Sequence, residues 1–392
     1  MRSIARTAKK GVTFYNPLKA DDGYTLFCCI YAKDVWLIDM EGHIVNRWRV
    51  PYPPGLHGIL LPNGNLLYAA QPKVAAEYGF PREFSGIGGL FLELDWDSNI
   101  VWEAEAPYQD HDFQVIHNDH IIYMAYHPKG VLPDEIAAKV IGGRPGTELN
   151  GKIWGDVVFE MDRNGNTVWE WLAYKHLEPE LYPMCPLEDR YQWPYINAVW
   201  VCHDGNILLS TRYINEVIKV DYQTGKVIGR YGRGELAHQH DARELDNGNI
   251  LVFDNGSHRQ NQEPSYSRSV EIDPNTDKIV WQYKADPPSD FYTAITAGSE
   301  RLPNGNTVIC DSWHGRIFEV TVEGELVWEY ASPFWYITSV LNRNSAMMFR
   351  AHRYSRDYLG LKGKDLNPAR FPWENRIFGP DAFKKEFAPC IF

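Results

Sequence analysis

Residues 160–171 read EMDRNGNTVWEW, and variants of this stretch recur along the chain. Each copy begins with an acidic or turn residue and a short polar turn, continues to a valine, and reaches an aromatic residue shortly after it. The six copies occupy residues 37–48, 93–103, 160–171, 219–231, 271–283 and 319–330. Their separation suits four-stranded units that are joined by loops of variable length.

A second repeat precedes the first in most of these units. It places a Gly or Asp turn between two apolar runs, which is the pattern of a tight β-hairpin. Its copies occupy residues 60–69, 115–124, 200–210, 244–253 and 301–310. Helical periodicity is nearly absent, and residues 133–140 are the best helical candidate. Two hairpins in each unit therefore predict an all-β chain with the architecture of a propeller.

The two ends of the chain fix the expected number of blades. Residues 24–50 supply three strands with no first strand before them, and residues 345–354 are the last strand-like run. We therefore predict that residues 345–354 pair beside the N-terminal strands. This gives a single six-bladed propeller domain over residues 1–392, closed by N- and C-terminal strands in one blade. The tail, residues 355–392, is expected to pack outside the ring.

Composition limits the classes of partner. The 392 residues include 39 Lys and Arg against 51 Asp and Glu, a net charge of -12 that disfavours nucleic acid as a partner. The basic N-terminus lacks the apolar run of a signal peptide, and no apolar stretch reaches about 18 residues, so we expect no membrane association. Six cysteines without a CxxC pair suggest reduced thiols and a cytoplasmic protein. Nucleotide-binding glycine motifs are absent from the sequence.

Propeller topology sorts the histidines between two faces. Loops that join the second and third strands of a blade lie on the same face as the loops that join blades. On this near face, His57, His111 and His240 begin innermost strands. Arg259 and His314 lie in loops of the same face. We expect these groups to point into one funnel, and such a collection in a net-acidic protein indicates an anionic substrate or a metal.

The remaining candidates are grouped by their expected positions. Further near-face residues are His127, Arg212 and His258. The histidines expected in solvated hairpin turns of the opposite face are His43, His117, His120 and His203. Structural roles are assigned to His176, His238 and His352. Candidate partners that would orient histidines are Asp241, Asp254 and Asp311.

Several segments resemble the bacterial arylsulfotransferase family over roughly residues 10 to 360. They are HDFQ (111–114), QHDARELDNGNILVFDNGSHR (239–259), RLPNGNTVICDSWHGRIFEV (301–320) and FRAHRY (349–354). The resemblance implies a six-bladed propeller that transfers a sulfuryl group from an aryl sulfate to a phenolic acceptor. It also implies a transiently sulfated histidine and no need for the nucleotide donor PAPS or another cofactor.

The same resemblance implies roles for individual residues. His240 matches the family's QH position, Arg259 matches the arginine after FDNG, and His111 resembles the upstream histidine. Blade order assigns the nucleophile to His314. Arg259 would bind the sulfonate oxygens, and His111 and His240 would transfer protons. Aromatic residues expected either to stack on the aryl ring or to pack within loops are Trp193, Tyr195, Tyr266, Trp313 and Trp335.

Two other classes of function remain open on the residues alone. Histidines from separate blades can hold a transition metal, and His57, His111, His240 and His314 form such a set. That site would make the chain a metal-dependent oxidase, lyase or hydrolase acting on small aromatic substrates. The third class is a binding propeller without catalytic activity.

Overall fold

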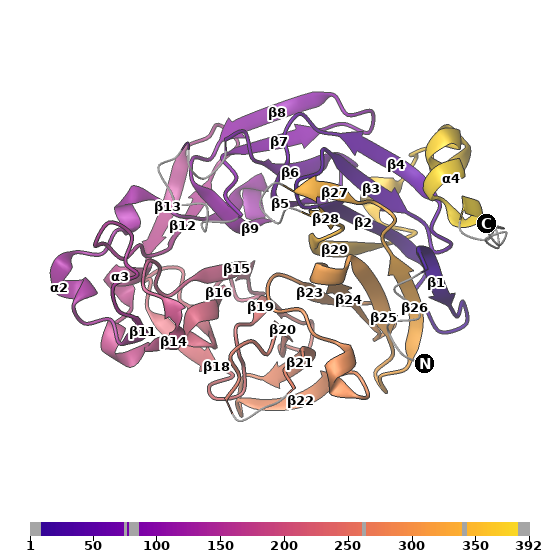
Figure 1. Ribbon diagram of the computed structural model, residues 1–392. Helices are drawn as coiled ribbons and strands as arrows, with labels where there is room; N and C mark the ends of the chain where they lie inside the picture. Colours follow the sequence, from indigo (N-terminus) through magenta and orange to yellow (C-terminus); the bar gives the residue numbers. More distant parts are fainter. Residues whose placement is uncertain (1–8, 74–76, 78–85, 261–263, 339–342, 383–392) are drawn as a thin grey trace. The chain divides into compact units, whose positions relative to one another are not determined.

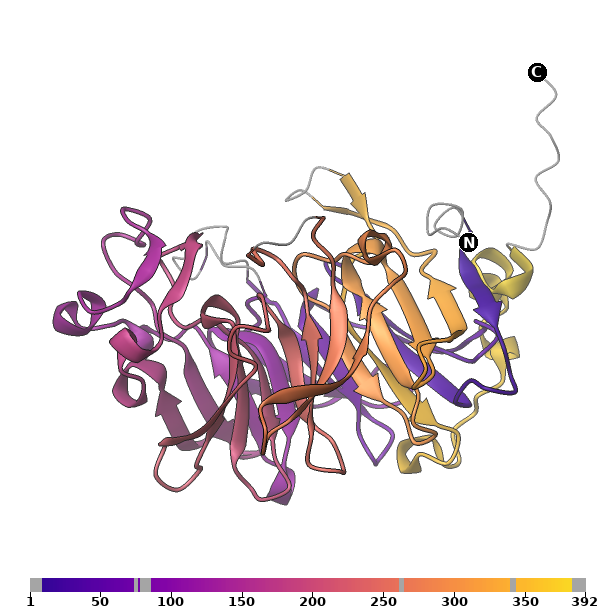
Figure 2. The same cartoon turned by 90° about the horizontal axis from the view of Figure 1, so that it is seen from below.

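The computed structural model describes residues 9–73, 77, 86–260, 264–338 and 343–382 (Figure 1). Its main strands form six antiparallel sheets, five with four strands and one with five. This arrangement is a six-bladed β-propeller, so the predicted fold class is confirmed. Figure 2 shows the same strands from a second direction.

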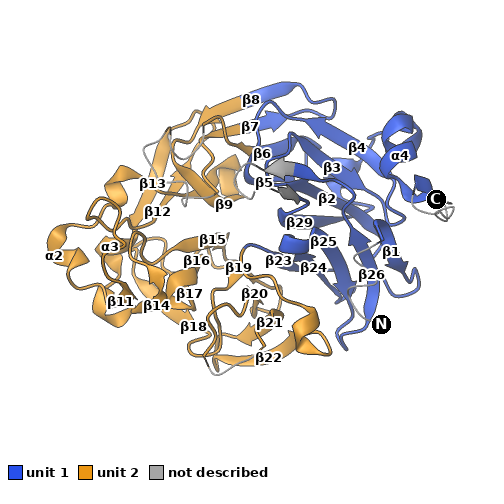
Figure 3. Cartoon of the chain, viewed as in Figure 1, with its two compact units in different colours: residues 1–68, 92–102, 296–392 blue, residues 69–91, 103–295 orange. Residues whose placement is uncertain are grey.

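The chain divides into two compact units (Figure 3). The first unit holds residues 1–68, 92–102 and 296–392, and the second holds residues 69–91 and 103–295. Each unit is described by itself. The blade that follows the N-terminal blade consists of β5 (Pro54–Leu60), β6 (Leu66–Ala70), β7 (Leu90–Leu94) and β8 (Ile100–Glu105).

One blade of the first unit joins both ends of the chain. Its strands are β2 (Gly23–Cys29), β3 (Asp34–Ile38), β4 (Ile44–Arg49) and β29 (Met348–Ser355). β29 lies beside β2 (Figure 1) and pairs with it in antiparallel register, with Tyr24 opposite Tyr354. The prediction that residues 345–354 complete the N-terminal blade is therefore confirmed.

A second blade of the first unit has one strand more than the repeat predicts. Its repeat strands are β23 (Gly298–Arg301), β24 (Thr307–Asp311), β25 (Arg316–Val320) and β26 (Leu326–Ala331). β1 (Gly11–Tyr15) adds to β26 in antiparallel register, with Gly11 opposite Ala331. The added strand covers the hydrogen-bonding edge that β26 would otherwise expose.

The second unit contains three complete blades. The first consists of β9 (Gln109–Val115), β10 (Ile121–Ala125), β12 (Val157–Met161) and β13 (Thr167–Leu172). The next consists of β15 (Ile196–Val201), β16 (Ile207–Thr211), β17 (Glu216–Val220) and β18 (Val227–Tyr231). The last consists of β19 (His240–Glu244), β20 (Ile250–Asp254), β21 (Arg268–Asp273) and β22 (Lys278–Tyr283).

Two insertions interrupt the repeat in the second unit. The segment between β10 and β12 carries α2 (Asp134–Ala137), within the predicted helical stretch, and β11 (Gly142–Arg144). The segment between β13 and β15 carries α3 (Ala173–His176) and β14 (Met184–Asp189). β11 and β14 pair in parallel, so the two insertions form one small sheet.

Short elements complete the secondary structure. The 3-10 helices are η2 (His117–Asp119), η3 (Pro128–Gly130), η4 (Pro179–Leu181), η5 (Arg212–Ile214), η6 (Pro288–Asp290), η7 (Ser312–His314), η8 (Leu359–Leu361), η9 (Pro368–Arg370) and η10 (Pro380–Ala382). A separate two-stranded sheet pairs β27 (Tyr336–Thr338) with β28 (Arg343–Ser345). Within the described part of the chain, no helix is both long and apolar enough to cross a membrane.

The C-terminal tail packs along the N-terminal blade of the first unit. It contains α4 (Pro372–Phe378), which lies beside β4 in Figure 1. The Asn375 side chain accepts a hydrogen bond from the backbone N–H of Ile44 at 2.8 Å and donates one to the Ile44 carbonyl at 2.9 Å. Residues 383–392 lie outside the described residues.

The repeated tryptophans join successive blades within each unit. The buried Trp48 indole donates to the Asp95 carbonyl at 2.9 Å, and the Trp171 indole donates to the Gly225 carbonyl at 2.9 Å. Each acceptor lies in the outer hairpin turn of the following blade. The aromatic position of the repeat therefore satisfies a buried N–H while it fills the space between two sheets.

Candidate functional site

Three charged or titratable groups in the second unit converge on Glu188 of β14. Its Oε1 lies 2.8 Å from His238 Nε2, 3.1 Å from Arg212 Nη1 and 3.6 Å from His258 Nδ1. His238 precedes β19, Arg212 begins η5, and His258 follows β20. The inserted strand β14 thus places a carboxylate among cationic and imidazole groups from two blades. We call these four residues the Glu188 cluster.

Backbone geometry fixes the histidines of this cluster. His238 Nδ1 lies 2.9 Å from the Ser257 carbonyl, which can only accept, so this nitrogen carries the proton. Gly256 has a φ of +76°, and a Cβ there would lie 2.0 Å from the Tyr266 carbonyl oxygen. Only glycine therefore permits the turn that presents Ser257 and His258.

Charge and burial act in opposite directions on the cluster. Burial raises the pKa of Glu188, but His238 and the positive charge of Arg212 outweigh burial and bring that pKa to about 2. Burial lowers the pKa of His238, and the nearby Arg212 lowers it further, although Glu188 opposes both effects. Glu188 is therefore ionised at neutral pH, and His238 favours its neutral form.

Replacing Glu188 by glutamine is expected to lower the free energy of unfolding by about 3 kcal/mol, because removal of one partner leaves the buried Arg212 without its carboxylate. Urea denaturation in the presence of a chelator measures this change. Glu180→Gln is the matched control, since exposed Glu180 lies 3.8 Å from Lys139 and should change stability by less than about 0.5 kcal/mol. Equal effects of the two substitutions would contradict the interpretation.

His240 begins β19 beside the Glu188 cluster, at the start of an innermost strand as predicted. Its Nδ1 lies 2.7 Å from Asn255 Oδ1 and 3.2 Å from the His238 carbonyl. The Asn255 amide is itself held, because its Nδ2 donates to the Thr293 carbonyl at 2.8 Å. The amide oxygen therefore accepts from His240 Nδ1–H, which leaves Nε2 as the basic nitrogen of the neutral ring.

Arg259 follows the turn at Gly256, and its guanidinium already donates two hydrogen bonds within the protein. Nη2 donates to Asp254 Oδ2 at 2.6 Å, and Nη1 donates to the Glu235 carbonyl at 2.7 Å. The fully buried Asp254 carboxylate also accepts from Arg268 Nε at 2.7 Å. Asp254 therefore orients arginines, whereas the sequence suggested that it orients a histidine. Asp241 likewise accepts from Arg243 Nε at 2.8 Å.

His111 on β9 belongs to a buried chain of polar groups. Its Nδ1 lies 2.5 Å from Asp110 Oδ2, and its Nε2 lies 3.3 Å from the Tyr195 hydroxyl. Burial raises the pKa of Asp110 to about 6, and His111 opposes this shift. Tyr195 stacks on Tyr213 with 4.5 Å between ring centroids, and the Arg212 guanidinium lies 5.3 Å from its ring. Tyr195 thus links His111 to the Glu188 cluster.

His314 ends η7 in the first unit. Its Nδ1 lies 2.9 Å from Oδ1 of the buried Asp311, and 44% of its side chain is exposed. Gly315 follows with a φ of +62°, where a Cβ would lie 2.6 Å from the Ala346 Cβ, so glycine is required after the histidine. The hydrogen bond that His314 donates to Asp311 raises the pKa of His314, and burial only partly opposes it. Asp311 therefore orients a histidine, as the sequence suggested.

The Asp311 contact predicts a measurable titration. We expect the His314 imidazole to titrate above its ordinary pKa of 6.5, and Asp311→Asn to lower the midpoint. Because the folded state favours the protonated ring, this pairing stabilises the fold below pH about 6.5 and the stabilisation is lost as pH rises through the raised pKa. NMR titration measures both midpoints, with the turn residue His203 as the internal control. An unchanged His314 midpoint in Asp311→Asn would contradict the assignment.

The other histidines occupy different settings. His57 on β5 is buried, and its Nδ1 lies 3.4 Å from Nε2 of His352 on β29. His352, for which the sequence suggests a structural role, thus contacts His57, a residue predicted to face the funnel. His352 Nδ1 also lies 3.5 Å from Glu300 Oε2. Three hairpin-turn histidines pair with a nearby carboxylate: His43 with Asp39, His120 with Glu160, and His203 with Glu244.

The sequence of this chain is similar to that of a known protein family. A family model described as Arylsulfotransferase (ASST) matches residues 57–333. The chain belongs to this family. The matched span includes His57, His111, His240, Arg259 and His314. No curated protein matches the chain.

Solved structures resemble this arylsulfotransferase-family chain in fold. A protein of unknown function from Bacteroides caccae is 13% identical with a TM-score of 0.53, and the match covers 85% of this chain and 98% of that chain. A streptogramin B lyase is 12% identical with a TM-score of 0.45, covering 90% and 95%. A virginiamycin B lyase from Staphylococcus aureus is 10% identical with a TM-score of 0.45, covering 85% and 88%. The first of these matches supports the propeller fold alone.

The aromatic residues that were candidates for stacking on an aryl ring differ in their exposure to solvent. Trp193 is fully buried and its indole donates to the Tyr182 carbonyl at 3.0 Å, so it packs in the core and offers no face to a ligand. Trp313 is partly buried against a cluster that includes Phe349. Trp335 is exposed, with Lys10 Nζ 4.4 Å from its ring centroid. Of the two roles expected for these aromatic residues, Trp193 therefore has the packing role.

Sequence reasoning missed three residues of the second unit. Glu188 and Cys185 lie on the inserted strand β14, outside both repeats, so no periodic signal marks them. His238, for which the sequence suggests a structural role, is fully buried and contacts Glu188. The available signal was its position two residues before His240 in the AHQHD segment.

Proposed function

We propose that this arylsulfotransferase-family chain transfers a sulfuryl group from an aryl sulfate to a phenolic acceptor through a sulfo-histidine. The proposed reaction uses neither PAPS nor a metal. The observation that carries the proposal is the Asp311–His314 pair within the span that the family model matches. Asp311 holds the proton on Nδ1, so the partly exposed imidazole keeps its lone pair on Nε2.

The first half-reaction forms an N–S bond and breaks the S–O bond to the aryl group. His314 Nε2 attacks sulfur, and the aryl oxygen leaves with the electron pair and takes up a proton. The Asp311 carboxylate stabilises the positive charge that develops on the ring. Because transfer of this kind passes through a loose transition state with charge on the equatorial oxygens, cationic donors supply most of the stabilisation.

The second half-reaction returns the histidine to its starting state. The phenolic oxygen attacks sulfur, the N–S bond breaks, and the phenolic proton passes to a base. We assign proton transfer to His240 and His111, since each has a carboxylate or amide oxygen at its Nδ1. We assign the sulfonate oxygens to Arg259, whose planar guanidinium is preorganised by Asp254.

The state of the cysteines supports a cytoplasmic location, which we also propose. Within the part of the chain that the structure describes, the thiols of Cys28, Cys29, Cys185 and Cys202 are buried and form no disulfide. Free thiols without disulfides are typical of a reducing compartment.

A direct assay tests the proposed reaction. Chelator-treated protein is incubated with 4-nitrophenyl sulfate and phenol in buffer without PAPS, and both 4-nitrophenol and phenyl sulfate are quantified. We expect the two products in equal amounts, with their formation dependent on phenol. Release of inorganic sulfate in place of phenyl sulfate, or an absolute requirement for PAPS, would contradict the proposal.

A further inference from the structure

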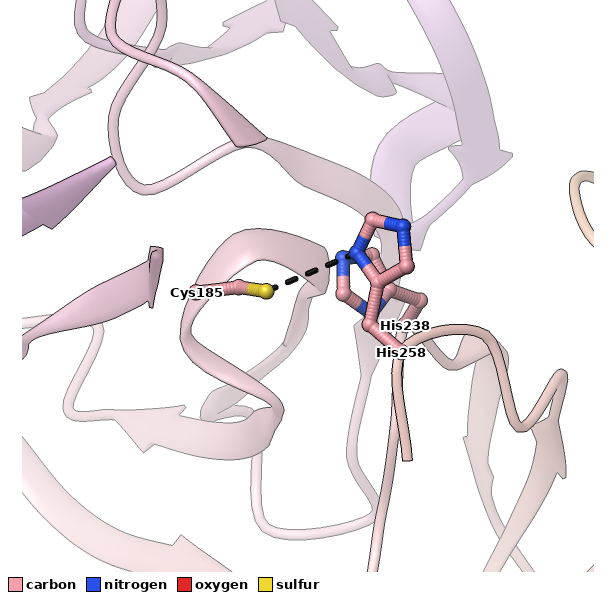
Figure 4. Close-up of side chains that lie close together, drawn as sticks. All are labelled: Cys185, His238 and His258. Carbon is pink, nitrogen blue, oxygen red and sulfur yellow. Dashed lines mark hydrogen bonds between the residues drawn. The ribbon is translucent and has the colours of Figure 1, made fainter. Parts of the chain in front are cut away.

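Cys185 lies beside the two histidines of the Glu188 cluster, and these three potential metal ligands have no role in the proposed transfer (Figure 4). Cys185 comes from β14, His238 precedes β19, and His258 follows β20. Their ligand atoms all lie within 4.8 Å of one another. Figure 4 shows the Cys185 sulfur directed at the His258 ring, and Sγ lies 3.5 Å from Nδ1.

Two of the three distances between these ligand atoms are close to those of tetrahedral coordination, and the third, from Glu188 to His238, is shorter. In a tetrahedral Zn²⁺ site with metal bonds of ordinary length, a thiolate sulfur and an imidazole nitrogen lie about 3.6 Å apart. The observed separation of Cys185 Sγ from His258 Nδ1 is 3.5 Å. A nitrogen and a carboxylate oxygen on the same ion would lie about 3.3 Å apart. Glu188 Oε1 lies 3.6 Å from His258 Nδ1 and 2.8 Å from His238 Nε2.

The ring of His238 is oriented as metal-binding imidazoles are. Its Nδ1 donates to the Ser257 carbonyl at 2.9 Å, which leaves the Nε2 lone pair for a ligand bond. Nε2 is buried and makes no hydrogen bond of acceptable geometry, although Glu188 Oε1 lies 2.8 Å away. A lone pair that faces a carboxylate oxygen at this distance is repelled by it, and a cation bound to both atoms would relieve the repulsion.

We propose that Cys185, His238 and His258 bind a Zn²⁺ ion, with Glu188 Oε1 as the fourth ligand. One thiolate, two imidazoles and one carboxylate form a donor set that Zn²⁺ accepts. Arg212 Nη1 lies 3.1 Å from the same carboxylate oxygen. Binding replaces the thiol proton of Cys185, and this proton passes to the solvent.

The ion would cross-link parts of the second unit that are distant in the sequence. It joins the inserted strand β14 to the turn after β20, which ends at Arg259. His258 is partly exposed, so an ion can enter from the solvent. The ion takes no part in the transfer chemistry, and the inference goes beyond the proposed function.

Cobalt titration of the chelator-treated full chain tests this site. We expect one Co²⁺ per chain, a thiolate-to-cobalt charge-transfer band, and loss of that band when Zn²⁺ is added. Cys185→Ser should abolish the band. His258→Ala should weaken Co²⁺ binding by more than about 100-fold, since even an outer partner of a metal ligand contributes about 10- to 100-fold.

Two variants serve as controls. Cys202→Ser removes another buried cysteine of the same unit, and His240→Ala removes a histidine of the transfer proposal; both should keep the band. Zn²⁺ should also raise the melting temperature of the wild type but not of Cys185→Ser. If Cys185→Ser fails to fold, the surface-accessible His258→Ala decides the outcome. No charge-transfer band in the wild type, or a band that survives Cys185→Ser, would overturn the proposal whatever the transfer assay gives.

Discussion

Replacing His314 by alanine is expected to lower the rate of sulfuryl transfer by at least about 1,000-fold, because the covalent route loses the nitrogen that accepts the group. His314 is suited to this role since Asp311 fixes its tautomer from a buried position and the ring itself is 44% exposed. The measurement is kcat/KM for 4-nitrophenyl sulfate with phenol as the acceptor.

Two further variants separate chemistry from folding in this experiment. His203→Ala removes an exposed histidine that also pairs with a carboxylate, Glu244, and should keep the wild-type rate. Asp311→Asn keeps the nucleophile but loses the fixed tautomer, so its rate should lie between those of the wild type and His314→Ala. A His314→Ala protein that melts at the wild-type temperature and retains activity would exclude His314 as the nucleophile.

Arg259→Lys is expected to lower kcat by about 100-fold, the usual loss when one preorganised donor to a developing anion is removed. The guanidinium uses Nη2 for Asp254 and Nη1 for the Glu235 carbonyl, and these two contacts fix its plane. A single ammonium group cannot make both contacts and also present a planar fork to the sulfonate.

Arg163→Lys is the matched control for this substitution. Arg163 also donates to a carboxylate, Asp119 at 2.8 Å, but it lies in the turn between β12 and β13. Its replacement should leave kcat unchanged. Melting temperatures test whether the Asp254 site survives in Arg259→Lys, and Arg268 remains as a partner there. A normal kcat in Arg259→Lys would show that the guanidinium does not contact the transferred group.

The fold was predictable wherever the sequence repeats. The hairpin turns mark the strands, and the unpaired N-terminal strands required a partner that residues 345–354 supply. β1 and β14 could not be predicted in this way, since neither carries a repeat. β1 is defined by the open edge of β26, and β14 by its pairing with β11, so both depend on tertiary contacts.

Burial of the repeat valine shows the same limit. Val45 and Val327 are buried, whereas Val101, Val168 and Val280 are exposed. The equivalent positions differ because the C-terminal tail packs on β4 and β1 packs on β26. Sequence periodicity identifies the position in the blade, but the covering segment decides its environment.

The candidate site was predictable in residue type and less so in contacts. Strand position placed His240 at the start of β19, and the sequence suggested a carboxylate partner for a histidine at Asp311. His238 and Asp241 have φ values of 55° and 53°, so strict two-residue alternation does not hold around His240. For this reason alternation could not show that His238 contacts Glu188 while Asp254 contacts two arginines.

Intact-protein mass spectrometry after incubation with 4-nitrophenyl sulfate, without any acceptor, tests the central claim most directly. The account predicts an increase by the mass of one SO₃ group per chain, located on the peptide that contains His314 and removed when phenol is added. Transfer to phenol with no such adduct, or an adduct on a residue other than His314, would contradict it.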